Sequence, residues 1–312
     1  MENERNACIP RTIVTPITLE SDPFILIDRM QWAKEYAEGA FDDLYPVSLV
    51  PEGMEADKDK LPLLVNMATV DDDVKNRWAE MLKESSSSQS PFPLAMLLQM
   101  DRSQHDTEYL KTHLIQQLIQ RDRQANLKYL LRYYDSRVLS HIQRIMRPGQ
   151  MRYLLEPITR WDYYLRGTWH TITIPTIAPA PLLLINNNQW DRIKRVGEIN
   201  RVISHLPAID QQSAFDALAQ KIEALLVKAQ SLYHLANPED RVAFAMHGMT
   251  INERFDTHPL MQEVFSRLEK DAASSYQYEV TSITEENWET IKQWKNQGLV
   301  TFNINPISDG VS

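Results

Sequence analysis

The chain has 312 residues, of which 43% are hydrophobic, and its 33 basic and 42 acidic side chains give a net charge of −9. A chain of this size can bury a substantial core, and its acidic balance argues against a protein that works by binding nucleic acid phosphates. One cysteine, Cys8, excludes a disulfide within the chain and is typical of a reducing compartment.

No targeting or membrane signal is recognisable in the sequence. The first ten residues, MENERNACIP, are charged and lack the apolar stretch of a signal peptide. The longest apolar runs are much shorter than a membrane span. We therefore expect a cytoplasmic protein with no membrane partner.

The first half of the chain alternates short apolar runs with amphipathic segments. Buried strands are predicted at Phe24–Ile27, Leu61–Met67, Pro93–Met100 and Leu127–Tyr134, and an edge strand at Thr168–Pro175. Helices are predicted at Ala33–Leu44, from the acidic run at Asp71 to Leu82, after Ser103, and after Asp135, whose carboxylate can cap a helix. This alternation predicts an α/β lobe with a mixed, partly parallel sheet and flanking helices.

The second half of the chain is predicted to be helical. Three prolines, Pro175, Pro179 and Pro181, fall within seven residues and indicate a connection between lobes. Helices are predicted at Gln189–Ile203, along Phe215–Leu232, from Asn237 to Gly248, from His258 and after Thr284. Short connections favour an all-α helical bundle. The expected domains are a flexible N-terminus (1–22), an α/β lobe (23–175), a linker (176–188), a helical lobe (189–300) and a C-terminal tail (301–312).

The charge is concentrated in one place. Residues 1–120 have a net charge of −10, whereas residues 121–166 contain 10 Lys/Arg and 4 Asp/Glu, a net charge of +6. This basic stretch is either a set of solvated arginines on helix faces or a docking surface for an acidic patch of a partner.

The sequence contains no recognisable reaction centre. Cys8 has no basic neighbours that would activate it, and no G-x-S-x-G, P-loop or G-x-G-x-x-G pattern occurs. The eight histidines lack metal-ligand spacing. We therefore expect neither a metal site nor a cofactor.

Arg132 and Asp135 form the most suggestive polar pair. They follow a predicted strand, where they could act as a substrate clamp and a catalytic acid. Alternatively, Asp135 caps the next helix and pairs with an arginine. Tyrosines and tryptophans crowd the same region; most should be buried, but arginine beside Tyr and Trp is also typical of binding hot spots.

The run Leu131–Leu139 (LRYYDSRVL), followed by Gln150, Glu156-Pro157-Ile158 and Trp161, resembles the signature of the type VI secretion system effector adaptors, also called effector chaperones or Tap/Tec proteins. This chain has Ser136 where proline is common in the family. Further segments agree in order and extend the resemblance to roughly residues 24–270: Leu61–Val65, Pro93–Leu98, Asp240–Ala245 and Phe255–Pro259.

The resemblance implies a protein without catalytic residues that binds a toxic effector, often near its N-terminal region, and loads it onto a cognate spike protein of the VgrG class. Arg132 and Asp135 are expected to hold the fold of the motif. The arginine–aromatic stretch itself predicts the partner-binding residues Arg132, Tyr134, Asp135, Arg137, Arg144, Arg152, Arg160 and Trp161, with Arg137, Arg144, Arg152 and Arg160 as the main contacts. The alternatives are a hydrolase-like enzyme that uses Asp135, and a regulatory or nucleic-acid-binding module that uses residues 121–166.

Overall fold

The computed structural model describes residues 11–13, 16, 18–32, 41–85, 96–166, 168–172, 180–207, 212–271 and 273–294. The chain divides into two compact units, one made of Met1–Asn200 and Pro207–Asp216, the other of Arg201–Leu206 and Ala217–Ser312. The division falls within helices α6 (Asn187–Ser204) and α7 (Gln212–Ser231), further along the chain than the predicted linker. Cys8, most of the predicted helix Ala33–Leu44 and the predicted tail lie outside the described residues.

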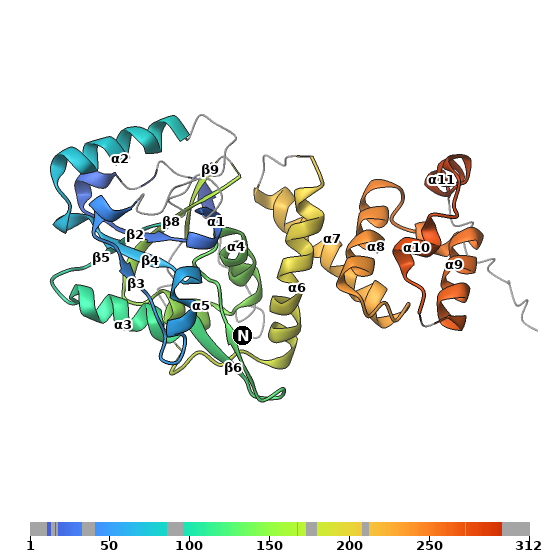
Figure 1. The fold of residues 1–312 in the computed structure, drawn as a ribbon, viewed down its shortest axis with the longest axis horizontal. Helices are drawn as coiled ribbons and strands as arrows, with labels where there is room; N and C mark the ends of the chain where they lie inside the picture. Colours follow the sequence, from blue (N-terminus) through green and yellow to red (C-terminus); the bar gives the residue numbers. More distant parts are fainter. Residues whose placement is uncertain are drawn as a thin grey trace, which may run out of the picture. The chain divides into compact units, whose positions relative to one another are not determined.

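A seven-stranded sheet forms the centre of the first unit (Figure 1). Its strand order is β1-β9-β8-β5-β2-β4-β3, and each pair of neighbours is antiparallel. The strands are β1 (Arg11–Ile13), β2 (Phe24–Ile27), β3 (Val47–Ser48), β4 (Leu63–Asn66), β5 (Met96–Met100), β8 (Ile158–Leu165) and β9 (Thr168–Ile172).

The prediction of partly parallel pairing is therefore wrong, and the strand order gives the reason. Strands β4 and β5 are joined through helix α2 (Asp72–Ser85) and run in the same direction, as a strand–helix–strand unit should. However, β2 lies between them, runs in the opposite direction and pairs with both. The helical crossover is present, but the two strands that it joins are not neighbours.

Helices cover both faces of the sheet (Figure 1). Side chains alternate between the faces along each strand: Phe24 and Leu26 of β2 point into one core, whereas Ile25 and Ile27 point into the other. The first core contains side chains of α3 (Thr107–Leu118), α4 (Ser136–Ile145) and α5 (Pro148–Leu155), and the second contains those of α2. Burial on both faces explains why these strands are continuous apolar runs in the sequence.

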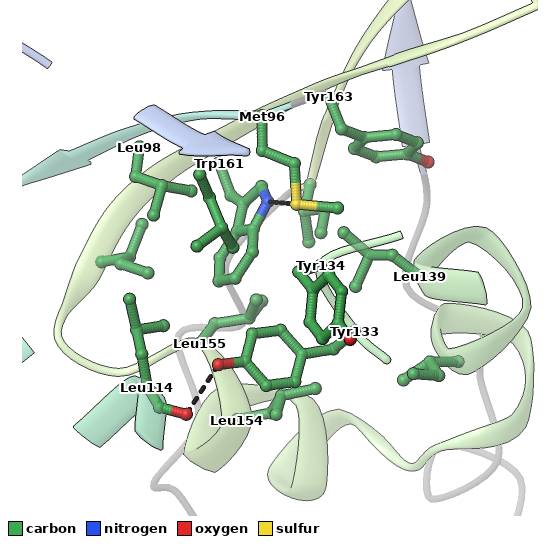
Figure 2. Packing of buried hydrophobic residues seen from close by; sticks show 14 of the residues in the cluster. Met96, Leu98, Leu114, Tyr133, Tyr134, Leu139, Leu154, Leu155, Trp161 and Tyr163 are labelled. Carbon is green, nitrogen blue, oxygen red and sulfur yellow. Dashed lines mark hydrogen bonds between the residues drawn. The ribbon is translucent and has the colours of Figure 1, made fainter. Parts of the chain in front are cut away.

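The predicted strand Leu127–Tyr134 is different from what its apolar sequence suggests. Only Leu127–Leu130 forms a strand, β7, and it pairs with β6 (Ile119–Asp122) in a separate two-stranded ribbon. The following residues Leu131, Tyr133 and Tyr134 are buried in the first core without forming a strand. Figure 2 shows how Tyr133 and Tyr134 lie; the Tyr133 hydroxyl donates to the Leu114 carbonyl at 2.6 Å.

The longest strand of the sheet, β8, has no counterpart among the predicted strands. Its polar residues interrupt the apolar pattern, yet Trp161 and Tyr163 are fully buried, as expected for the aromatic residues of this region. The Trp161 indole N–H donates to the Met96 sulfur at 3.2 Å (Figure 2), which adds a side-chain bond between the neighbouring strands β8 and β5.

The predicted position of one strand and the predicted cap of one helix are also wrong. Strand β9 is not at the edge of the sheet, because β1, from the predicted flexible N-terminus, pairs with its outer side. Helix α3 is capped by Asp106 rather than Ser103: the Asp106 carboxylate accepts the Tyr109 N–H at 2.8 Å.

The second unit is helical in the described residues. It contains most of α7, then α8 (Pro238–Thr250), α9 (Pro259–Lys270), α10 (Tyr276–Val280) and α11 (Glu285–Lys292). The predicted starts at Asn237, His258 and Thr284 are confirmed, since each side chain accepts a backbone N–H of the first turn. The core of this unit is a cluster of aromatic rings around Phe244, which contacts Tyr233, Phe255, Phe265 and Tyr276.

Gly248 lies inside α8, not at its end as predicted. A Cβ atom on Gly248 would lie 2.6 Å from Cδ2 of Leu225, which belongs to α7. The absence of a side chain therefore allows α7 and α8 to pack closely at this point. Gly197, on the exposed side of α6, has open space around it.

The same substitution should therefore act in opposite directions at these two glycines. We expect Gly248→Ala to lower the free energy of unfolding by about 1 kcal/mol, because the cost of overpacking exceeds the gain in helix propensity. Gly197→Ala should raise it by about 0.5–1 kcal/mol, since only the propensity changes. Chemical unfolding of both variants measures the difference; equal stabilisation by both would contradict close packing at Gly248.

Candidate functional site: a buried carboxylate–arginine cluster

Four charged side chains form one ion-paired network, here called the motif cluster: Asp28, Arg132, Asp135 and Arg137. Asp28 directly follows β2, and the other three lie in the segment between β7 and α4 and in the first turn of α4. Arg132 Nη2 lies 3.0 Å from Asp28 Oδ2 and 3.4 Å from Asp135 Oδ2. Arg137 binds Asp135 through two parallel contacts, Nε to Oδ1 at 3.0 Å and Nη2 to Oδ2 at 2.8 Å.

Asp135 is the N-cap of α4, as the sequence predicts. Its backbone is extended and its Oδ1 accepts the Arg137 N–H at 3.0 Å. Both carboxylate oxygens are therefore bonded, one to a backbone amide and the Arg137 guanidinium, the other to the two arginines. This arrangement agrees with the structural interpretation of Asp135 and leaves its side chain 2% exposed.

Asp28 is the member of the motif cluster that the sequence analysis misses. It is fully buried, and its carboxylate accepts the Met30 N–H and the Gln31 side-chain amide, both at 3.0 Å. Burial raises the pKa of Asp28 above its ordinary value, the bond from Gln31 and the charge of Arg132 oppose the rise, and the charge of Asp135 adds to it. The only signal in the sequence is a carboxylate at the end of a buried strand.

Arg132 and Tyr134 connect the motif cluster to the hydrophobic core. The Arg132 guanidinium lies 5.7 Å from the centre of the Tyr134 ring, within the range of a cation–π contact. Tyr134 is fully buried, and this burial is the main cause that raises its pKa to about 12. About a third of the Arg132 side chain (34%) and half of the Arg137 side chain (51%) remain exposed to solvent.

The exposed groups of the motif cluster are its guanidiniums. The carboxylates of Asp28 and Asp135 are buried and bonded to arginines and amides. Within the described residues, no group of three or more His, Cys, Asp and Glu side chains could hold a metal ion.

Four of the predicted partner-binding residues are buried. They are Tyr134, Asp135, Arg144 and Trp161. Trp161 and Tyr134 belong to the first core, and Asp135 is enclosed by its arginines. Arg144 lies on the buried side of α4, with Nη2 3.5 Å from His141 Nδ1. All four therefore have little exposed surface in this fold.

The remaining four residues, Arg132, Arg137, Arg152 and Arg160, are at least partly exposed but do not form a single surface. Arg160 lies next to Trp161 on β8 and so points to the α2 face of the sheet, where it pairs with buried Asp162 at 2.8 Å. Arg152 belongs to α5, which covers the opposite face. Only Arg132 and Arg137 are brought together.

Two carboxylates of the second unit, Asp240 and Asp256, also connect its helices; they belong to the resembling segments Asp240–Ala245 and Phe255–Pro259. Asp256 is fully buried. Its Oδ2 lies 2.5 Å from Nζ of Lys228, in α7, and 2.6 Å from the hydroxyl of Tyr233, just after α7. Asp240, in the first turn of α8, accepts the Gln277 N–H at 3.1 Å. Both residues explain the architecture of the second unit and offer no exposed reactive group.

Comparison with known proteins returns no match: no family model, no curated protein and no solved structure corresponds to the chain. The resemblance to the effector adaptors is thus carried by the motif residues alone. Among the residues described, no helix combines the length and the apolar character needed to cross a membrane.

Removal of Arg132 should expose the dependence of the motif cluster on its shared cation. We expect Arg132→Ala to lower the free energy of unfolding by about 2–4 kcal/mol, because two buried carboxylates lose their common partner while solvent reaches part of the site. Arg29→Ala is the matched control. Arg29 pairs with Asp59 at 3.4 Å, but Asp59 is 74% exposed, so the expected loss is below about 1 kcal/mol.

The pH dependence of the stability of Arg132→Ala identifies the cause of its lower free energy of unfolding. Without Arg132 the pKa of Asp28 should rise further, so the folded state binds a proton more strongly than the unfolded state. Stability then increases as the pH falls towards that pKa. The deficit of the variant should be largest at pH 7 and smaller at pH 5, as measured by urea unfolding. A deficit that is independent of pH would show that lost packing, not unpaired charge, is responsible.

His247 gives the second unit a pH dependence of the opposite sign. Its Nδ1 lies 2.7 Å from the Tyr276 hydroxyl, and burial lowers its pKa to about 4 from an ordinary value of 6.5. Neutral His247 is therefore favoured by folding, and this stability is lost as the pH falls from 6.5 to 4, up to about 3 kcal/mol. His247→Gln should flatten the stability profile in this window. A profile parallel to that of the wild type would contradict the assignment.

Proposed function

We propose that this chain is a non-enzymatic adaptor of a type VI secretion system, which binds a toxic effector and loads it onto a cognate VgrG-class spike protein. The observation that carries the proposal is the motif cluster. The charged residues of the resembling motif are bonded to one another, and the exposed parts of Arg132 and Arg137 lie side by side at its outer edge.

This arrangement suits a protein contact. The pairing with Asp135 uses Nε and Nη2 of Arg137, so the guanidinium keeps further N–H donors for a partner's carboxylate or carbonyl oxygens. Because Asp135 also fixes the orientation of Arg137, little side-chain entropy remains to be lost on binding. Pre-organised arginines beside aromatic residues are typical of binding hot spots.

Two compact units support the binding of two partners. If each unit contacts one of them, effector and spike are held at a high effective concentration relative to each other without any new contact between them. In this proposal the adaptor works in the cytoplasm, contacts the N-terminal region of the effector, and needs neither a cofactor nor a nucleic acid or membrane partner.

A hydrolase-like function is the second candidate, and one observation favours it. The buried carboxyl of Asp28 has a raised pKa and shares Arg132 with Asp135, so two carboxyl groups with different environments are close together. The burial of both carboxylates beneath their arginine and amide donors argues against it, because a general base must reach the proton that it removes.

Capture of the partners tests the adaptor proposal. The chain is co-expressed with the spike protein and the toxin that are encoded beside its own gene, and both should co-purify with it. Arg137→Lys retains a positive charge for Asp135 but removes the planar fork, so capture of at least one partner should weaken by about tenfold with little change in stability. Arg254→Lys, at an exposed arginine of the second unit, is the matched control.

The outcomes separate the candidates. Undiminished capture by Arg137→Lys would exclude the motif cluster as a contact surface, and failure of both partners to co-purify with the wild type would reject the loading function. Turnover of a small molecule that is lost in a folded Asp135→Asn variant would establish the hydrolase instead.

A further inference from the structure

The ribbon of β6 and β7 is an arm that extends from the first unit (Figure 1). Its two strands pair only with each other in the described residues, so each has an outer edge without a neighbouring strand. Four residues, 123–126, connect the strands, and Asn126 adopts a left-handed conformation with φ of 54°. An arm of this kind can accept a further strand from a partner.

Contacts with α6 hold one face of this arm in place. Tyr129 lies against Trp190, with ring centres 5.2 Å apart, and Lys194 Nζ lies 2.8 Å from Asp122 Oδ2. The other oxygen of Asp122 accepts the N–H groups of Gln124 and Ala125 at 3.0 and 3.1 Å, which fixes the connecting loop. The single acidic residue of the arm is therefore buried and paired with a lysine.

The opposite face of the arm carries an unfavourable pair of like charges. Arg121 and Lys128 lie directly across from each other in the β6–β7 register, and both are exposed. Like charges in facing positions destabilise a sheet. Exposed Arg123 follows in the loop, and the Arg121 guanidinium donates to the side-chain oxygen of Asn126. Among the described residues no carboxylate pairs with any of these three cations, so this face offers positive charge to a partner.

We propose that this end of the arm, with Arg121 and Lys128 on the strands and Arg123 in the adjoining loop, is a docking site for an extended acidic segment of a partner protein. In an extended segment alternate side chains share a face. A segment whose backbone pairs with the outer edge of β6 or β7 can therefore place a carboxylate beside Arg121 or Lys128 of that strand, on the same face. Charge complementarity selects an acidic occupant.

A peptide fits this site better than a nucleic acid does. The whole chain has a net charge of −9, so it repels a long polyanion, whereas a short acidic segment interacts mainly with the three nearby cations. The site is separate from the motif cluster and does not depend on the secretion function.

A synthetic peptide in which Glu alternates with Val or Thr is the probe, and fluorescence anisotropy with the full chain is the measurement. We expect saturable binding that weakens with salt, and no binding of the same peptide with Gln in place of Glu. The double variant Arg121→Glu/Lys128→Glu should bind at least about tenfold more weakly. Lys58→Glu/Lys270→Glu makes the same change in net charge at exposed lysines elsewhere and should bind within about twofold of the wild type.

Circular dichroism must first show that both double variants are folded; the milder Arg121→Gln/Lys128→Gln replaces the first if it is not. Equal binding by the arm variant and its control, or no binding of the Glu peptide, would overturn the proposal. Preferential binding of a short DNA duplex would also overturn it in favour of a nucleic acid site. Because the assay contains neither effector nor spike, its failure leaves the loading function standing.

Discussion

The first unit depends on one shared cation. Arg132 joins Asp28, which lies 104 positions earlier in the chain at the end of β2, to Asp135 at the start of α4. Since neither carboxylate reaches solvent, each would be costly to bury without this partner. A buried ion pair contributes little net stability compared with apolar packing, but it tolerates few alternative arrangements. Arg132 therefore fixes the start of α4 relative to the sheet, and α5 follows from that position.

The same bonds determine which parts of the motif remain outside. Tyr134 packs its ring against Arg132 and is therefore not available at the surface. Arg137 is bonded to Asp135, and half of its side chain is exposed. A sequence motif rich in arginine and tyrosine thus separates into a buried framework and a small exposed edge. The sequence alone does not show which residues of the motif are buried and which are exposed.

Local signals predict a large part of this fold. Continuous apolar runs locate β2, β4 and β5, and capping residues such as Asn237 and Thr284 locate helix starts, because each depends on neighbouring residues only. The failures involve partners that are distant in sequence. Strand β8 is obscured because Asp162 is polar, although it is buried and paired with Arg160. Asp28 has no local feature that would mark it as the partner of Arg132.

The apolar run Leu127–Tyr134 shows why hydrophobicity alone could not locate the site. Its second half is core, since Tyr133 is fully buried and its hydroxyl donates to the Leu114 carbonyl of α3. Its first half belongs to an arm on which Lys128 faces Arg121. One continuous run therefore changes role at Leu131, where the backbone N–H still bonds to Leu118 as the ribbon ends. Charge distinguishes the two halves. Arg121 and Lys128 are exposed and hydrated on the ribbon, whereas Tyr133 and Tyr134 are buried in the core beside Arg132, which reaches Asp28.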